Sequence, residues 1–483
     1  MADTSPNQRF SAAARGTMQL IAARVFFMGS GYAAAVILAR ELGPAAYGTY
    51  GLVISLLLWL EVLSGFGIPR AAAKLISQTA DPKSIVEATL AGLLAIGIIL
   101  LALCWIAAPY VAGFFDIRGG TALLRLAVLD LPFNGLYIAY HGVLIGYQQF
   151  WQISVTLVVY SLSKLLGTLA LFWIGFSVEA ALIVNVLATV GALAYLLFKF
   201  RWRLVLPDRR LFRSILAIAA PLAVLVVTMQ FVLSAHLWLL KRMGAATAEV
   251  LGFYIAALNI AQLPMIVPAA LGIVILSSVA AALARNDFAL AQRHVSNAGR
   301  FVVIVLAPVC VLGAIHATPI MSLLYSPTYE AGGIYLGILI GGYGLFALLD
   351  TLLHALIGAD RHHLASALLL AILPVVFLSG IGLIQLWGPT GAAASLLVTL
   401  GAGAGLAAIA AYRRFHVLPV APLTLARVAI ATAVAALAGV QIESSGIAVL
   451  FELALLSGIY LLVLAALREI GPQDLKPFAV WKS

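Results

Sequence analysis

Fourteen apolar stretches, each long enough to cross a lipid bilayer, occupy this chain of 483 residues between about residues 17 and 467. An α-helix rises about 1.5 Å per residue, so about 20 apolar residues cross the ~30 Å hydrocarbon core of a membrane. The chain is 64% hydrophobic and only 10% charged. Soluble domains carry about 25% charged residues. We therefore predict an all-α, polytopic membrane protein with about fourteen transmembrane helices. The expected spans are 17–39, 50–69, 86–114, 122–146, 152–175, 179–198, 214–240, 251–283, 301–325, 332–357, 365–387, 391–412, 426–442 and 446–467.

The basic residues indicate an orientation. If successive spans alternate in direction, 21 of the 28 Lys and Arg residues fall on the side of both termini, and five fall on the other side. Because basic loops remain in the cytoplasm, we expect both termini to be cytoplasmic. This asymmetry also explains the net charge of +10, so we expect no nucleic-acid binding. The first sixteen residues are polar, and we expect no removable signal peptide.

Several kinds of site are absent from the sequence pattern. All loops are short, the longest being 199–213 and 284–300, which argues against a membrane enzyme that polymerises or transfers sugars. There is no phosphate-binding glycine loop and no paired-histidine zinc motif. Cys104 and Cys310 both lie in apolar segments and are expected to be free, buried thiols. We expect no enzyme activity, no metal and no cofactor.

A short internal repeat suggests two similar halves. The segments 38–43 and 239–244 both precede a Tyr- and Gly-containing motif, at 47–50 and 251–254 respectively. Each repeat would hold six helices, an even number, so both halves would share one orientation. We expect a cytoplasmic tail at 1–16, a first lobe at 17–198, a basic linker at 199–213, a second lobe at 214–412, two extra spans within 413–467 and a cytoplasmic tail at 468–483.

Five segments carry a resemblance to a known family. They are LARELGPAAYGTYG at 38–51, GFGIP at 65–69, LGFYIAA at 251–257, LLYSPTYEA at 323–331 and GPTGAAA at 388–394. In this order they resemble the Wzx-type oligosaccharide flippases of the multidrug/oligosaccharidyl-lipid/polysaccharide (MOP) exporter superfamily. The resemblance implies two six-helix lobes around a central cavity that opens alternately to the two sides of the bacterial cytoplasmic membrane. The two spans after residue 413 would lie outside these lobes.

The same resemblance implies a cargo and partners. The cargo would be an oligosaccharide repeat unit linked through pyrophosphate to polyprenol, moved from the inner to the outer leaflet. Membrane lipids would surround the protein, and a polysaccharide polymerase and chain-length proteins are expected partners of what we expect to be a monomer. Transport without a nucleotide site would need another driving force, and the candidates are a proton or sodium gradient, the membrane potential and consumption of the cargo outside. A sugar and phosphate head group needs a polar route, because hydrocarbon does not solvate it.

Charged side chains inside spans are costly and usually functional. Arg24 and Lys164 are candidate phosphate contacts, and the alternatives are ion pairs with Glu61 and Asp130 or, for Arg24, snorkelling to the cytoplasm. Glu61 and Asp130 would either neutralise these bases or bind a coupling cation or proton. Asn134 lies one turn after Asp130, beyond Pro132, where sugar binding and a simple kink are both open interpretations.

The second half offers further polar candidates. Asp350 and His354 are spaced i, i+4 and should share a helix face, which would suit a proton relay or a charge pair. Asn259 and Gln262 are candidates for sugar contact, the alternative being hydrogen bonds between helices. Five bases are expected at the outer mouth, where they would guide phosphate or border lipid headgroups: Arg40, Arg118, Arg125, Lys241 and Arg242.

Aromatic residues and histidines near span ends suggest membrane interfaces. His141, His236 and Trp202 are expected there. Tyr137 and Tyr140 could stack against sugar rings.

Two other functions stay open. A multidrug or organic-cation antiporter of the same superfamily would use acidic cavity residues, and Glu61, Asp130 and Asp350 could serve. A lipid II flippase would also have two helices beyond twelve. That branch carries several basic cavity residues in both lobes, whereas the second half here has no deeply placed Lys or Arg.

Overall fold

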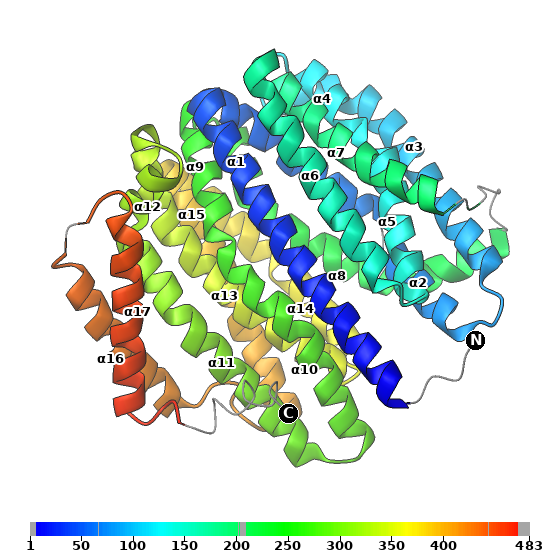
Figure 1. Cartoon of the computed structure of the whole chain (residues 1–483). Helices are drawn as coiled ribbons and strands as arrows, with labels where there is room; N and C mark the ends of the chain where they lie inside the picture. The colour runs from blue at the N-terminus through cyan, green and yellow to red at the C-terminus, as the bar shows by residue number, and fades with distance from the viewer. Residues whose placement is uncertain (1–5, 66, 201, 203–208, 443, 472–483) are drawn as a thin grey trace. The chain divides into compact units, whose positions relative to one another are not determined.

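The computed structural model describes every residue except 1–5, 66, 201, 203–208, 443 and 472–483 (Figure 1). This described part of the chain contains α-helices, two short 3-10 helices and no strand. In chain order the elements are α1 (Pro6–Gly65), α2 (Ile68–Gln78), α3 (Lys83–Phe114), α4 (Gly120–Val128), α5 (Asp130–Gly146), α6 (Phe150–Ile174), α7 (Val178–Lys199), α8 (Arg209–Arg242), α9 (Ala248–Ala261), η1 (Leu263–Met265), α10 (Ile266–Ala284), α11 (Phe288–Ile315), α12 (Ala317–Leu324), η2 (Pro327–Gly332), α13 (Gly333–Gly358), α14 (His362–Ala371), α15 (Leu373–Phe415), α16 (Pro422–Gly439) and α17 (Ala448–Ala466).

The predicted spans are present as helices. Twelve helical segments of the described chain are long and apolar enough to cross a membrane. Two of them, Ala22–Gln78 and His362–Phe415, are 57 and 54 residues long. Since about 20 residues make one span, each of these two is long enough for two spans. The fourteen apolar stretches are therefore all found in helices, and the chain is a multi-pass membrane protein.

Both long segments are divided by a Gly-Pro pair. Gly43 in α1 has φ 72° and ψ 167°, and Gly388 in α15 has φ 57° and ψ −130°. These angles strongly favour glycine, which ends one helix, and the following Pro44 or Pro389 starts the next with a φ that suits a helix. The sequence predicts a loop between the spans 17–39 and 50–69. In the structure Gly43 is the one non-helical residue there, and the two helices follow each other directly.

The chain forms two compact units, residues 1–234 and 235–483, and α8 contributes to both. In the first unit, α1 lies along α6, and α3 lies along α5 (Figure 1). Helices α3 and α5 can pack closely because Gly97 and Gly135 have no Cβ. A Cβ at Gly135 would lie only 2.8 Å from the Leu93 carbonyl oxygen, and one at Gly97 only 2.7 Å from the Pro132 Cα. Small residues at these positions allow van der Waals packing in lipid, where the hydrophobic effect does not hold helices together.

The predicted linker, 199–213, lies partly outside the described residues. Its described aromatic residues pack within the first unit. Trp202 stacks on Tyr140 with ring centroids 5.1 Å apart, and Tyr140 donates a hydrogen bond to the Phe200 carbonyl at 3.3 Å. Tyr140 is therefore buried in internal packing and not exposed for sugar stacking, while the interfacial position of Trp202 stays a prediction. The lobe boundaries 17–198 and 214–412 stay predictions.

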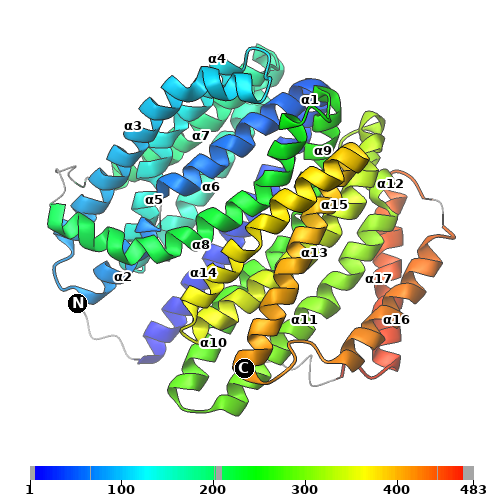
Figure 2. The ribbon, with the colours of Figure 1, turned by 180° about the vertical axis from the view of Figure 1, so that it is seen from behind.

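In the second unit, α13 packs along α15 (Figure 2). A Cβ added at Gly342 would lie 3.5 Å from the Cα of Leu397, and one added at Gly403 would lie 3.0 Å from the side chain of Leu349. Both glycines belong to the Gly-rich runs of the sequence, and here they form close contacts between helices. Cys310 donates through its Sγ to the Ile340 carbonyl at 3.3 Å. Cys104 and Cys310 are free, as predicted, but half-buried rather than fully buried.

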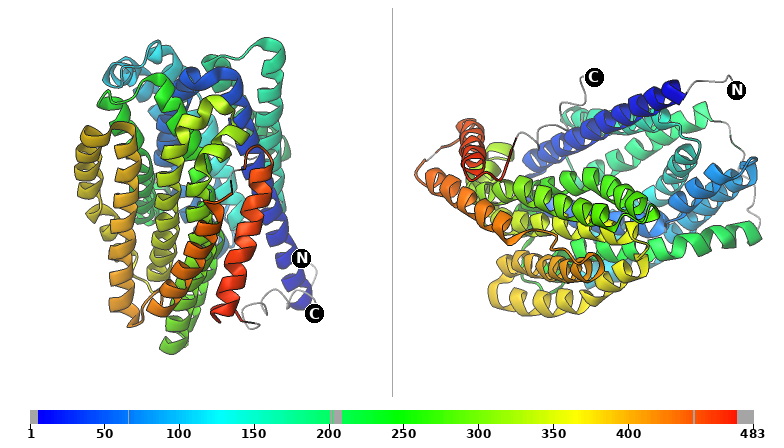
Figure 3. Two further views of the ribbon diagram at one scale, coloured as in Figure 1. Left: turned by 90° about the vertical axis from the view of Figure 1, so that its left-hand side faces the viewer. Right: turned by 90° about the horizontal axis from the view of Figure 1, so that it is seen from below.

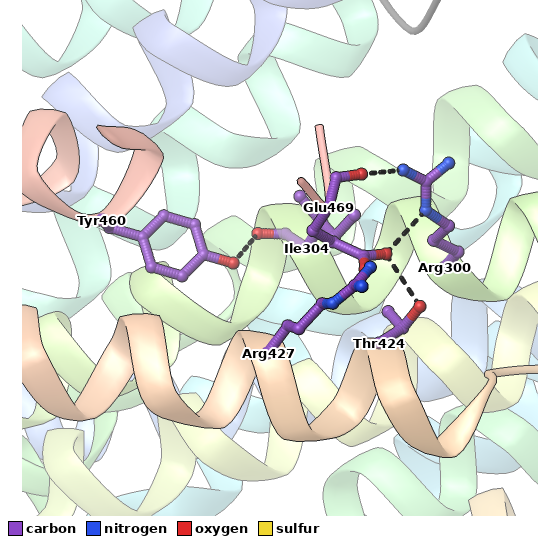
Figure 4. A network of polar contacts seen from close by, with 6 residues as sticks. All are labelled: Arg300, Ile304, Thr424, Arg427, Tyr460 and Glu469. Atoms are coloured by element: carbon purple, nitrogen blue, oxygen red, sulfur yellow. Dashed lines mark hydrogen bonds and ion pairs between the residues drawn. The ribbon is translucent and has the colours of Figure 1, made fainter. Parts of the chain in front are cut away.

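The last two helices, α16 and α17, pack on each other and on α11 (Figure 3). Beside α11, His316 Nε2 lies 2.8 Å from Glu452 Oε1 of α17, and both side chains are buried. Tyr460 in the middle of α17 donates to the Ile304 carbonyl at 2.8 Å. After α17, Glu469 contacts Arg300, Arg427 and Thr424 (Figure 4). Polar contacts thus attach this helical pair to α11 along its length.

Candidate functional site

The first unit gathers three charged side chains from three helices. Asp130 begins α5 and is 1% exposed, while Glu61 near the end of α1 and Lys164 in α6 are half-buried. The side chains of Glu61 and Asp130 are neighbours, and Lys164 lies near both acids without a described ion pair to either. We call Glu61, Asp130 and Lys164 the charged cluster. In lipid, such grouping reduces the cost of placing charges away from water.

Helix α7 completes the charged cluster with neutral polar groups. Lys164 Nζ donates to Asn185 Oδ1 at 3.1 Å, and the Thr189 hydroxyl, which donates to the Asn185 carbonyl oxygen at 3.4 Å, lies near the Asp130 carboxyl. Asn185 and Thr189 are four residues apart, so they share one face of α7, and both are buried. Sequence reasoning missed these two residues. Their signal was a pair of polar side chains one turn apart in an otherwise apolar span.

This geometry separates the two bases predicted to contact phosphate. Lys164 donates to Asn185 and has two acids nearby, so its ammonium group already has polar neighbours in the first unit, and its role as a phosphate contact stays a prediction. Glu61 is influenced by the nearby Asp130 and Lys164, and no ion pair joins it to Arg24 among the described residues, so that alternative pairing is not formed in the structure. Arg24 is exposed on α1 and makes no ion pair with an acidic side chain in the described part of the chain.

Arg24 lies instead beside a histidine. Its guanidinium is close enough to the His141 ring for an electrostatic interaction. His141 Nε2 is 2.9 Å from Thr156 Oγ1 of α6, so His141 faces a neighbouring helix instead of a membrane interface. The rings of Tyr137 and His141 have centroids 4.4 Å apart, and those of Tyr137 and Tyr160 have centroids 6.1 Å apart.

The polar residues of α5 form one stripe. Asp130, Asn134, Tyr137 and His141 follow helical spacing and share one face, which runs about 16 Å along the axis. Tyr160 of α6 adjoins this stripe through the ring of Tyr137. The stripe therefore leads from the Arg24 end of the unit to the charged cluster, which makes a polar path inside a membrane-spanning bundle.

In the second unit, the two charged candidates lie together. His354 Nδ1 is 3.3 Å from Asp350 Oδ2 and 2.8 Å from the Asp350 carbonyl oxygen, as their shared helix face predicts. The His354 ring also packs against α10, because a Cβ at Gly272 would lie 3.0 Å from it. Asn259 in α9 and Gln262 directly after it are half-buried, next to η1. Their roles as sugar contacts stay predictions.

His236 differs from its expected interfacial position. It is 2% exposed, and its Nδ1 lies 2.6 Å from the Tyr254 hydroxyl, which is fully buried. This histidine therefore joins α8 to α9 inside the protein.

The predicted outer-mouth bases have different surroundings. Arg125 lies over the Trp105 ring at 5.3 Å, and its Nε donates to the Trp105 carbonyl at 3.4 Å, so it holds α4 against α3. Arg40, Arg118 and Arg242 are exposed, and Lys241 is half-buried. Packing within the unit thus accounts for Arg125, and the role of the other four stays a prediction.

Comparison with known families decides the affiliation of the chain. Residues 13–281, more than half of the chain, match the model of the family described as polysaccharide biosynthesis protein. The chain belongs to this family. No curated protein matches the sequence. The matched range contains Arg24, the charged cluster and the whole polar stripe of α5.

Several solved structures share the fold of this chain. This polysaccharide biosynthesis protein is similar to a lipid II flippase, MurJ, in an inward closed conformation, with TM-score 0.80, 13% identity and coverage of 94% of this chain and 99% of that one. It is also similar to a multidrug resistance MATE family transporter of the MOP superfamily, with TM-score 0.70, 16% identity and coverage of 81% and 94%. A MOP superfamily transporter from Pyrococcus furiosus matches with TM-score 0.61, 16% identity and coverage of 84% and 96%. At these identities the likeness establishes the fold, which is that of MOP-superfamily flippases and transporters.

Proposed function

We propose that this protein moves a polyprenyl-pyrophosphate-linked oligosaccharide from the inner to the outer leaflet of the bacterial cytoplasmic membrane. The family match and the MOP fold support transport of a lipid-linked substrate. The observation that carries the proposal is the contrast between two bases. Lys164 donates to Asn185 and lies near two acids, whereas Arg24 is exposed near His141 without a described acidic partner.

Arg24 is suited to a pyrophosphate. A guanidinium offers a planar fork of donors that fits two phosphate oxygens at once. The polyprenyl chain would stay in the bilayer, while the head group crosses along polar side chains such as Asn134 and Tyr137. Asn259 and Gln262 are the proposed sugar contacts of the second unit. The protein would work as a monomer with cytoplasmic termini and would deliver its cargo to a polysaccharide polymerase and chain-length proteins.

The two alternatives receive less support. An organic-cation antiporter would need free acidic groups, but Glu61 and Asp130 lie beside Lys164, and Asp350 lies beside His354. A lipid II flippase shares the fold, yet the second half of the sequence has no deeply placed Lys or Arg for that cargo.

Arg24→Ala tests this function. The variant should insert normally but flip a fluorescent polyprenyl-pyrophosphate disaccharide in liposomes on the order of 10-fold or more slowly, because a charged contact is lost. Arg24→Lys should recover part of the rate only if charge alone matters. Arg293→Ala, which changes an exposed arginine of α11, is the matched control and should behave like the wild type. Full activity of Arg24→Ala would contradict the role of Arg24, and export of organic cations without lipid flipping would favour the antiporter.

A further inference from the structure

An open apolar groove lies between α1 and α6 of the first unit. Its volume is about 410 Å³, and its walls include Ala22, Ala23 and Phe26 of α1 and Val155 and Val158 of α6. Pockets that bind small molecules and cofactors have volumes of about 300–1,000 Å³. The groove is therefore large enough to hold part of a ligand, and its walls offer that ligand mainly hydrocarbon surface.

The groove is a hollow on a packed pair of helices. Beside it, the rings of Phe27 and Tyr160 have centroids 5.6 Å apart, so α1 and α6 are in contact there. The open space continues along α1. Gly29 lies seven residues after Ala22 on the same helix face, and a Cβ added there would meet no atom within 4 Å. The groove thus leads along α1 toward the middle of its span.

One end of the groove lies at the membrane interface. Gln19 and Trp151 are both exposed, and each is the first groove residue of its helix. Tryptophan is enriched where membranes meet water. The only other polar wall residue, Ser154, donates its hydroxyl to the Phe150 carbonyl at 3.0 Å. The predicted orientation puts this end at the inner leaflet, where the proposed cargo starts.

Arg24 belongs to the same turn of α1 as the groove. It directly follows Ala23, and its guanidinium is near His141 on another face of the helix. The cation therefore suits an anionic head group immediately beside a seat for a hydrocarbon chain. In a prenyl pyrophosphate the chain begins at the phosphate oxygen, whereas in a glycerophospholipid the glycerol separates phosphate from chains. The short spacing between Arg24 and the groove favours the prenyl pyrophosphate.

We infer that the α1–α6 groove holds the first part of the polyprenyl chain while Arg24 binds the pyrophosphate. This inference rests on the proposed function and adds a binding site for the tail of the cargo. From Gln19 to Phe26 the groove extends about 10 Å, so the rest of the chain stays in the bilayer. A chain that leaves lipid for this groove gains little from the hydrophobic effect. Van der Waals contacts with the walls would instead hold the chain, and with it the head group, in position.

Photolabelling of the wild type tests this site without any variant. A polyprenyl pyrophosphate with a diazirine in its first isoprene units is added to the protein in liposomes, and labelled residues are identified by mass spectrometry. The label should fall within 19–26 and 151–159. Excess unlabelled polyprenyl pyrophosphate should remove the label, whereas excess phosphatidylglycerol should not.

A filled groove provides the second test. Val158→Trp should lower this labelling on the order of 10-fold and slow flipping of the lipid-linked disaccharide, because the indole and the chain cannot occupy the groove together. Val434→Trp, at an exposed position of α16, is the matched control and should label and flip like the wild type.

Three results would overturn the inference. They are labelling confined to other helices, removal of the label by phosphatidylglycerol, which would make the groove a site for ordinary membrane lipids, and wild-type flipping by Val158→Trp. Each leaves the proposed function standing if the wild type flips the disaccharide. Specific labelling of the groove in a protein that flips no lipid-linked sugar would contradict the proposed function and leave the chain site in place.

Discussion

The Glu469 Oε1 atom accepts a hydrogen bond from Arg300 Nε at 2.9 Å, across 169 residues of sequence. Arg300 also donates to the Glu469 carbonyl oxygen. Arg427 Nη1 lies 2.9 Å from Glu469 Oε2, and Thr424 donates to Oε1 at 2.8 Å (Figure 4). The Glu469 carboxylate thus joins the segment after α17 to both α11 and α16. We expect this contact to stabilise the packing of α16 and α17 against α11.

This attachment should weaken in acid. Burial raises the pKa of Glu469, but hydrogen bonds from Arg427, Thr424 and Arg300 outweigh it and hold the pKa below its ordinary value. A carboxyl whose folded-state pKa is depressed stabilises the fold above its unfolded-state pKa, and this contribution is lost as the pH falls through the folded-state value. Thermal unfolding of the purified protein should therefore show a stability loss below about pH 4.5. Glu469→Gln should lower the free energy of unfolding by about 1–3 kcal/mol at neutral pH. The stability of this variant should also depend less on pH in the acidic range. Glu330→Gln, at an exposed position, is the control.

His316 and Glu452 form a second attachment, which a double-mutant cycle can measure. Their 2.8 Å contact is almost fully buried, and Ser444 also donates to Glu452. Glu452→Leu alone should cost about 3–5 kcal/mol, because it removes one partner of a buried polar pair. The double variant His316→Leu/Glu452→Leu should lose clearly less free energy of unfolding than the two single variants lose together. Additive losses in unfolding experiments would show that the two side chains do not interact.

The helix corners should resist substitution. Gly43→Ala and Gly388→Ala each place a side chain at a backbone conformation that almost only glycine adopts. We expect a cost of about 1–3 kcal/mol at each position. Gly31→Ala is the matched control. Gly31 lies within helix α1, and a Cβ added there would meet no atom within 4 Å, so this variant should keep its stability. Equal thermal stability of all three variants would contradict the assigned corner geometry.

Asn185 should stabilise the fold by accepting a hydrogen bond from Lys164. Asn185→Leu removes the acceptor 3.1 Å from Lys164 Nζ, so we expect a loss of about 1–3 kcal/mol. Lys164→Met should also destabilise the protein, because it leaves two acids without their base, whereas Arg24→Ala should not. Unfolding midpoints of the three variants check this order. An unstable Arg24→Ala with a stable Lys164→Met would reverse the roles assigned to the two bases.

The orientation can be tested with two exposed residues. In a cysteine-free background, Asp360→Cys in the α13–α14 turn should resist a membrane-impermeant thiol reagent in intact cells, and Arg118→Cys should react. The asymmetric distribution of Lys and Arg predicts this result. Labelling of both after permeabilisation confirms that each thiol is accessible. The opposite labelling pattern would place the termini outside.

The spans could be predicted from sequence because the thickness of the bilayer sets the length of an apolar helix, whatever its neighbours are. The i, i+4 spacing of Asp350 and His354 likewise places them on one helix face before any packing is known. These are local properties, and the fourteen stretches and this polar pair follow from them. The Gly-Pro corners at 43–44 and 388–389 lie within family motifs, but the sequence did not reveal how short they are.

The partners of the charged residues depended on tertiary structure. Lys164 could face Asn185, Asp130 or a phosphate, and only the rotation of α6 against α7 and α5 selects among them. Glu469 and Arg300 carry no local signal, since 169 residues separate them. The membrane fixes how far each helix extends, but helix packing fixes which polar atoms meet, because each buried charge must find its partner on another helix.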